Sequence, residues 1–166
     1  MPENLMLTPA YQLARLVRTH QLSPQELIAA AFDQIAAQNP ALNAVISERR
    51  AAAEKEAAHQ VDTGQPFLGV PLLLKGLGQA KAGLPATNGN VLFAKSVAKR
   101  SSNFTKALEA AGFLVIGQTN FPEFGFKNVT DAKLYGPAHN PWNTDYYPGG
   151  SSGGAGAAVA AGILPV

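Results

Sequence analysis

The sequence predicts an α/β protein, in which an N-terminal helical arm precedes part of a mixed β-sheet flanked by helices. Residues 1–63 contain amphipathic segments that begin at helix-capping residues. Two apolar segments of strand length follow, at 69–76 and at 113–117. The second of them comes directly after a helical pattern that ends at Gly112, and a helix, a glycine and a buried strand in succession are common in α/β proteins.

The first two helices of the arm are predicted from their start signals. Thr8 is suited to the N-cap of the first helix, with Pro9 at its first helical position. Ser23 and Glu26 have the spacing of a capping box, which predicts the start of the second helix. The dipeptide at 39–40, Asn-Pro, is expected to end this second helix, because proline disfavours helical geometry in the residue before it.

The rest of the arm contains one strand-like segment and one helix. Residues 42–46 are short and apolar and are expected to be extended. Ser47 is expected to cap a third helix that runs over 48–58 with a charged outer face. A Thr-Gly-Gln-Pro turn at 63–66 predicts a boundary between the arm and the following domain.

Residues 64–166 are expected to form a partial α/β domain. The strand at 69–76 is followed by a helix that begins at Ser101 or Ser102. A stretch rich in Asn, Pro, Gly and aromatic residues then runs over 119–148. Long irregular segments inside compact domains are usually functional or disordered, and the aromatic residues argue against disorder.

Composition and charge exclude several classes of function. The chain has 166 residues and a net charge of +2, which is too weak to indicate a nucleic-acid or membrane-surface partner. It has no cysteine, so disulfides, zinc-thiolate sites and cysteine nucleophiles are excluded. No signal peptide or apolar run of membrane-spanning length is visible, and no cluster of metal ligands. We therefore expect a cytoplasmic protein without a metal or cofactor.

The most informative segment is the glycine-rich run at 148–162. Ser151 and Ser152 lie between two glycine pairs, and an alanine-rich run follows. Glycine lets the backbone approach a ligand closely, and a helix that starts after the serines directs unpaired N–H groups towards its neighbours. This arrangement favours hydroxyl chemistry or anion binding. The alternative is a flexible linker, but the Ala/Val run has the composition of a packed segment.

A serine hydroxyl needs a base to become a nucleophile. His20 and His59 lie in the predicted arm, and His139 lies in the long loop. Lys75 is the other candidate, because it ends a buried strand and a desolvated lysine has a lowered pKa. The alternative for Lys75 is a solvated residue at a strand end. A nucleophile elbow, Gly-x-Ser-x-Gly, is also matched, but the elbow requires a strand directly before it, and Pro148 breaks one.

Taken together, segments spread over nearly the whole chain resemble the amidase signature family. The last of them is the most specific, and its spacing from Lys75 fits the family. In chain order they are LSPQEL at 22–27, GVPLLLK at 69–75, AGFLVIGQTN at 111–120, PEF at 122–124, NPW at 140–142 and PGGSSGG at 148–154.

The resemblance implies hydrolysis of carbon–nitrogen bonds in a small-molecule amide by a Ser–cis-Ser–Lys triad, on the amidase-signature fold. Lys75 matches the catalytic lysine of the family. Ser151 matches the bridging serine, whose peptide bond to Gly150 is cis in the family. Ser152 matches a serine that supports the hydrogen-bond network. The loop after Asn120 is expected to line the acyl or amide side of the site, with Gly125 as a candidate backbone contact to the substrate.

Other features of the sequence depart from the family pattern. The family's nucleophile and oxyanion hole lie in a second glycine-rich segment downstream of Ser151, and the sequence ends at Val166 before such a segment. We therefore expect a truncated chain, an incomplete fold and no activity of this chain alone. Gly76 also follows the lysine, where an acidic residue is common in the family.

Two further interpretations stay open. In the first interpretation, the chain is the amidase subunit of a tRNA-dependent amidotransferase and works with partner subunits. Against it, the TNGN sequence at 87–90 is more similar to a free amidase. Alternatively, it is a truncated, non-enzymatic module that forms a homo-oligomer, because half of a sheet leaves an open edge and an apolar face.

Overall fold

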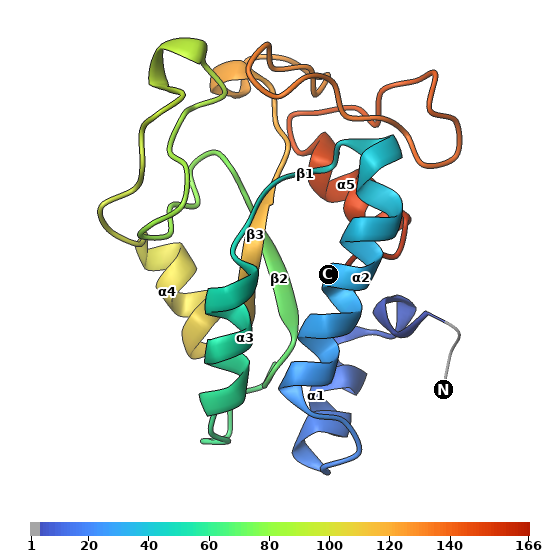
Figure 1. Ribbon diagram of the computed structural model, residues 1–166, viewed down its shortest axis with the longest axis vertical. Helices are drawn as coiled ribbons and strands as arrows, with labels where there is room; N and C mark the ends of the chain where they lie inside the picture. The colour runs from blue at the N-terminus through green and yellow to red at the C-terminus, as the bar shows by residue number, and fades with distance from the viewer. Residues whose placement is uncertain (1–3) are drawn as a thin grey trace.

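The computed structural model describes residues 4–166, so the first three residues of the predicted arm lie outside the described residues. After two consecutive helices, strands and helices alternate along the chain, which confirms the predicted α/β class (Figure 1). The helices are α1 (Ala10–Arg18), α2 (Pro24–Leu42), α3 (Arg50–His59), α4 (Asn103–Ala110) and α5 (Gly153–Ala160). The strands are β1 (Val45–Glu48), β2 (Pro71–Lys75) and β3 (Leu114–Thr119), and the 3-10 turns are η1 (Leu5–Leu7), η2 (Val91–Phe93) and η3 (Glu123–Gly125).

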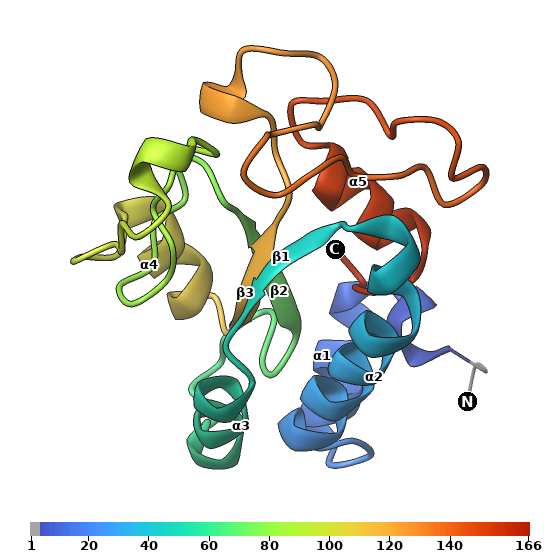
Figure 2. The ribbon, with the colours of Figure 1, turned by 45° about the horizontal axis from the view of Figure 1, so that its top comes forward.

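The three strands form one mixed sheet in the order β1-β3-β2 (Figure 2). β1 runs antiparallel to β3, and β2 runs parallel to it. All six residues of β3 are buried, as expected for the central strand. Since β2 and β3 are parallel, their carboxyl ends meet at one edge, where Lys75 pairs with Thr119. The glycine-rich segment also lies at the carboxyl ends of these two strands.

The two faces of the sheet are covered by different helices. The larger hydrophobic core joins α1, α2 and α3 to the sheet and includes Phe32 of α2 and Ile116 of β3, both fully buried. A smaller cluster contains Leu74 and Val115, with Leu108 of α4 packed against it. α4 accordingly lies on the opposite side of the sheet from α2 (Figures 1 and 2). Since β1 pairs with β3, the predicted arm and the sheet share one core; the boundary near residue 63 stays a prediction.

The start of α2 confirms the predicted capping box, but its predicted end is wrong. Ser23 Oγ accepts from the Glu26 N–H at 3.2 Å, and the Glu26 carboxylate accepts from the Ser23 N–H at 2.7 Å. The helix continues through Pro40 and ends with Asn43 in the left-handed conformation. Leu42 is buried in the core, so tertiary packing holds the last turn beyond the proline.

Two other helix starts also differ from the prediction. Pro9, and not Thr8, occupies the N-cap of α1. Ser47 does not cap α3, because it belongs to β1 and its hydroxyl donates to Gln118 Oε1 of β3 at 2.9 Å. Pairing with the central strand extends β1 to Glu48 and delays the helix. Ser102 is the N-cap of α4, as one of the two predicted candidates.

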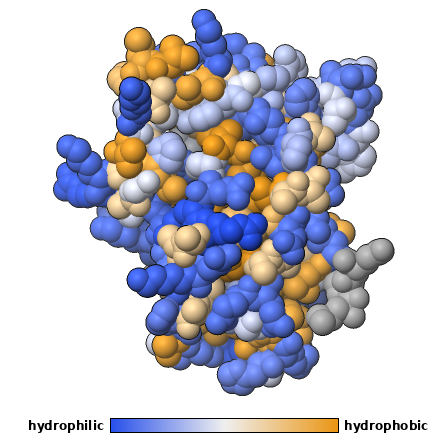
Figure 3. All heavy atoms as spheres, in the orientation of Figure 1, coloured by the Kyte–Doolittle hydropathy of each residue, from blue (hydrophilic) through white to orange (hydrophobic). Residues whose placement is uncertain are grey.

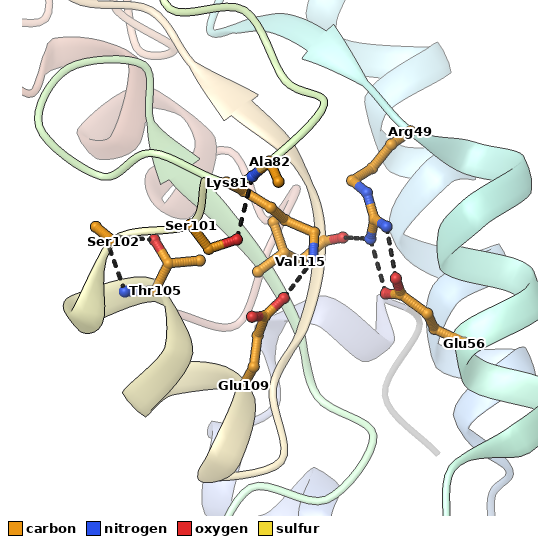
Figure 4. A network of polar contacts seen from close by, with 9 residues as sticks. All are labelled: Arg49, Glu56, Lys81, Ala82, Ser101, Ser102, Thr105, Glu109 and Val115. Atoms are coloured by element: carbon orange, nitrogen blue, oxygen red, sulfur yellow. Dashed lines mark hydrogen bonds and ion pairs between the residues drawn. The ribbon is translucent and has the colours of Figure 1, made fainter. Parts of the chain in front are cut away.

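An ion pair ties α3 to the sheet (Figure 4). Nη1 of Arg49 donates to Glu56 of α3 at 2.7 Å and to the Val115 carbonyl oxygen of β3 at 2.7 Å. The pKa of Glu56 is lowered, mainly because its carboxylate accepts from Arg49. Among the helices of residues 4–166, none combines the length and the hydropathy that a membrane crossing requires.

Candidate active site

Lys75 and Ser151 meet at the carboxyl edge of the sheet. Lys75 is the last residue of β2, and Ser151 lies in the glycine-rich segment directly before α5. Lys75 Nζ donates to Ser151 Oγ at 2.7 Å, although the two residues are 76 positions apart in the sequence. The two candidate site residues are therefore hydrogen-bonded to each other, and their catalytic roles stay predictions.

The surroundings of Lys75 at the end of β2 affect the pKa of its amine. Its side chain is half-buried, and this burial lowers the pKa of the amine. Its backbone N–H donates to Gln79 Oε1 at 2.8 Å, which holds the chain as it leaves the strand. A lysine with a lowered pKa is neutral over a wider pH range, and a neutral amine can accept a proton.

Close packing against Phe121 explains why position 76 is a glycine. A Cβ at this position would lie 2.3 Å from Cε1 of Phe121, which is fully buried. No side chain fits there unless Phe121 moves, so an acidic residue after the lysine is incompatible with this packing. Neither Gln79 nor Phe121 was among the residues that the sequence predicted.

The serine segment, residues 148–154, adopts an irregular backbone up to the start of α5. The Gly150–Ser151 peptide bond is cis, as the family resemblance implies, and Gly149 has a φ of +84°. Ser152 is the N-cap of α5, but its side chain forms no capping hydrogen bond. The first N–H groups of α5 are instead bound by other segments: Gly153 donates to Thr130 Oγ1 at 3.1 Å, and Gly154 to the Asn120 carbonyl oxygen at 3.2 Å.

A cavity of about 240 Å³ opens beside Lys75. Its polar lining comes from Lys75, Gln79, Thr119 and Ser152. The remaining lining is apolar and consists of Leu72, Leu73, Phe104, Leu108, Ala155, Ala158, Val159, Leu164 and Val166. Mostly apolar walls with a few convergent polar groups are typical of small-molecule sites.

Gly125 lies in η3, between two exposed phenylalanines. Its φ is +74°, and its N–H donates to the Pro122 carbonyl oxygen at 2.8 Å, so this donor is used in the turn. The ring centroid of Phe124 lies 6.4 Å from that of Phe93 and 6.1 Å from that of Phe126. Apolar side chains reach the surface over η2 and η3, at the upper left of Figure 3. A contact between Gly125 and a substrate stays a prediction.

Ser151 forms its side-chain hydrogen bond with Lys75, and two of the three histidines contact the backbone of their own segments. Nδ1 of His139 lies 2.7 Å from the Thr144 carbonyl oxygen, within its own loop. Nδ1 of His59 lies 2.8 Å from the Lys55 carbonyl oxygen in α3. Across residues 4–166, no group of three or more His, Cys, Asp or Glu side chains is placed to hold a metal ion. The amine of Lys75 is thus the base candidate that contacts Ser151.

The family model for Amidase matches residues 26–166, which include both Lys75 and Ser151. The chain belongs to the amidase family. A lipoamidase of Enterococcus faecalis is 55% identical over 157 residues, which are 95% of this chain and 22% of that protein. A glutamyl-tRNA(Gln) amidotransferase subunit of Azoarcus is 38% identical over 93% of this chain and 33% of that protein.

The fold agrees with this assignment. The solved structure of a 6-aminohexanoate cyclic dimer hydrolase with its substrate matches with a TM-score of 0.91 and 37% identity. The match covers 97% of this chain and 33% of that structure. The chain therefore spans about a fifth to a third of the length of these amidase relatives.

Proposed function

We propose that this chain supplies the lysine and the bridging serine of a Ser–cis-Ser–Lys amidase, which hydrolyses carbon–nitrogen bonds. The observation that carries the proposal is the 2.7 Å contact between Lys75 Nζ and Ser151 Oγ at the edge of a small cavity. Hydroxyl and amine are the two groups that such a proton relay needs, and the family assignment makes amide hydrolysis the expected reaction.

In this mechanism the proton moves along one line. The neutral amine of Lys75 accepts the proton of the Ser151 hydroxyl, and Ser151 accepts the proton of an attacking serine alcohol. The alcohol oxygen bonds to the amide carbonyl carbon, and the C–N bond breaks as the proton passes to the departing amine. A water molecule, deprotonated by the same relay, then releases the acid from the acyl-enzyme and regenerates the serine. Ser152 and Gly150 support this segment, the former from the cavity wall. Burial of Lys75 lowers its pKa and so favours the neutral amine that the relay requires.

The attacking serine and the oxyanion hole are proposed to come from a further segment that follows Ser151 in a complete enzyme. The relatives support this, because the chain corresponds to only 22% to 33% of their length. A chain that holds two members of a three-member relay loses most of the catalysis, since such residues act as a unit. We therefore expect no amidase turnover from these 166 residues alone.

The substrate is proposed to be a small-molecule amide. The relative at 55% identity is a lipoamidase, so lipoamide is the first substrate to test. The cavity beside Lys75 has mostly apolar walls, which suits an uncharged organic group next to the scissile bond.

The test uses a complete enzyme in which residues 1–166 are followed by an amidase C-terminal segment. Lys75→Ala and Ser151→Ala should each lower kcat by about 10²- to 10⁴-fold, the usual contribution of general acid–base groups. Lys106→Ala, at an exposed position of α4, is the matched control and should retain activity. In the unaltered enzyme kcat should rise with pH as the Lys75 amine loses its proton. Full activity of the Lys75→Ala enzyme would contradict the proposal.

The subunit of a tRNA-dependent amidotransferase is the second candidate, which the relative at 38% identity favours. A subunit of this kind copurifies with partner subunits or binds tRNA, whereas a free amidase does neither. A non-enzymatic homo-oligomer is the third, since β2 lies at the edge of the described sheet. Light scattering decides it: a monodisperse monomer excludes this third interpretation.

A further inference from the structure

The hydroxyl of Thr130 binds the backbone on both sides of Ser151. Thr130 lies in the irregular segment after β3, and its side chain is fully buried. Thr130 Oγ1 donates to the Gly149 carbonyl oxygen at 3.0 Å and accepts from the Gly153 N–H at 3.1 Å. One hydroxyl therefore connects the residue two positions before Ser151 with the residue two positions after it.

This hydroxyl also replaces the local cap of α5. The first N–H groups of a helix have no partner inside the helix and are usually bound by the N-cap side chain. Ser152 occupies the N-cap but forms no such bond, and Gly153 is bound by Thr130 instead. The cap thus comes from a residue 23 positions earlier in the chain. As a result, neither serine has to turn towards the helix, and Ser151 is free to face Lys75.

The packing leaves this segment little freedom to move. A Cβ on Gly153 would lie 2.3 Å from Thr130 Oγ1, and a Cβ on Gly150 would lie 2.8 Å from the backbone of Asn128 and Val129. Residues 128–130 are themselves held, because the Thr130 carbonyl oxygen accepts from the Ala138 N–H at 2.9 Å. The serine segment is therefore seated against a fixed part of the loop.

We propose that Thr130 is a positioning residue, whose hydroxyl holds the 149–153 segment so that Ser151 Oγ stays in contact with Lys75 Nζ. The geometry is independent of catalysis, but its meaning for amide hydrolysis rests on the proposed function. The amine of Lys75 donates its hydrogen bond to Ser151. If the hydrogen bonds of Thr130 to this segment are lost, Ser151 is free to move away and the Lys75 amine becomes exposed to water. Thr130→Val keeps the shape of the side chain and removes the hydroxyl, while Thr130→Ser keeps the hydroxyl.

The test follows Lys75 in this chain by the pH titration of its ε-carbon resonance, which Lys75→Arg assigns. In Thr130→Val the titration midpoint should move up, towards that of a hydrated lysine, and Thr130→Ser should restore the midpoint of the unaltered protein. Thr105→Val is the matched control, because Thr105 is equally buried and its hydroxyl is hydrogen-bonded to that of Ser102, the N-cap of α4, and not to the serine segment. It should leave the Lys75 midpoint unchanged.

The Gly153 amide gives a second readout. Loss of its acceptor in Thr130→Val should speed its hydrogen exchange by about fivefold relative to the Gly156 amide of the same helix, as expected for one hydrogen bond. An unchanged Lys75 midpoint in Thr130→Val, or failure of Thr130→Ser to restore it, would overturn the proposal. If Thr130→Val does not fold, rapid exchange of the Gly153 amide in the unaltered chain would overturn it. None of these measurements depends on amidase activity, so they separate this proposal from the proposed function.

Discussion

The helical layer α1–α3 and the serine segment are held in place by different kinds of contact. In the helical layer, apolar side chains such as Leu27, Ile28 and Phe32 are fully buried and fill the space against the sheet. In the serine segment, the close contacts are between glycine backbone and polar groups, as for Gly153 on Thr130 and Gly154 on Asn120.

This difference predicts different responses to mutation. The helical layer is stabilised by close packing of large apolar side chains, so truncating one of them leaves a cavity and lowers the free energy of unfolding. A segment held by close backbone approach tolerates no gain of volume, because an added methyl group has no space. The helical layer should therefore govern stability, and the serine segment should govern the geometry around Lys75.

The largest expected effect is truncation in the helical layer. Phe32→Ala should lower the free energy of unfolding by about 3–5 kcal/mol, as for other buried phenylalanines. The guanidinium carbon of Arg50 lies 4.1 Å from the Phe32 ring centroid, and this contact would also be lost. Urea unfolding measures the change. Phe126→Ala is the control, because Phe126 is 88% exposed and its removal should change stability by less than about 0.5 kcal/mol. Equal losses for the two variants would contradict the comparison.

The next prediction is that replacing glycine by alanine changes stability in opposite directions at two positions of α5. A Cβ on Gly154 would lie 2.4 Å from the Asn120 nitrogen, so Gly154→Ala should destabilise by about 1–3 kcal/mol. Gly156 has nothing within 4 Å of an added Cβ. Gly156→Ala should therefore stabilise the helix by about 0.5–1 kcal/mol, the usual advantage of alanine over glycine. Thermal unfolding of both variants decides this, and two changes of the same sign would count against the packing described for the serine segment.

Sequence patterns predicted best where the structure is local. The capping box of Ser23 and Glu26 and the apolar strand at 113–117 were read from neighbouring residues, and the structure confirms both. Lys75 and Ser151 are candidates both from the chemistry of their segments and from the family resemblance, and the structure brings them together.

The errors and omissions involve contacts between distant parts of the chain. Pro40 does not end α2, because the last turn is held by burial of Leu42. Ser47 pairs with Gln118, which is 71 positions away, and so is not a helix cap. Thr130 leaves no local signal at all, since its partners Gly149 and Gly153 lie far along the chain. Only the folded backbone shows that these groups meet.

A smaller effect on stability is expected from removal of the N-cap of α2, which is local, whereas the cap of α5 comes from the distant Thr130. Ser23→Ala removes the local cap of α2 and should cost about 1 kcal/mol of stability. The pKa of Glu26 is lowered, mainly by the Ser23 backbone N–H and also by its hydroxyl, so the variant should raise that pKa towards its ordinary value. Carbon NMR titration of Glu26 and urea unfolding measure the two changes. An unchanged stability would show that the cap of α2 is redundant.

The smallest effect on stability concerns two ionisable side chains, Glu56 and Lys75, whose surroundings differ. Glu56 has Arg49 as a charged partner, and its pKa is lowered from 4.5 mainly by that hydrogen bond. The stability that Glu56 contributes is present above pH 4.5 and is lost as the pH falls through its lowered pKa. Because its side chain is 41% exposed, solvent screens the pair, and Glu56→Gln should remove less than about 1 kcal/mol. The acid-side slope of stability against pH should flatten in this variant.

Within residues 4–166, the amine of Lys75 donates to a neutral hydroxyl, that of Ser151, and burial lowers its pKa from 10.5. The folded state then binds fewer protons than the unfolded state between the lowered pKa and 10.5, so stability rises with pH in this window. Lys75→Met should remove this alkaline-side slope and leave the acid-side slope of Glu56 intact. Urea unfolding of the unaltered chain and of both variants over a pH series tests the pair. A Lys75→Met chain with the alkaline-side slope of the unaltered protein would show that the amine is hydrated and that the serine segment does not bury it.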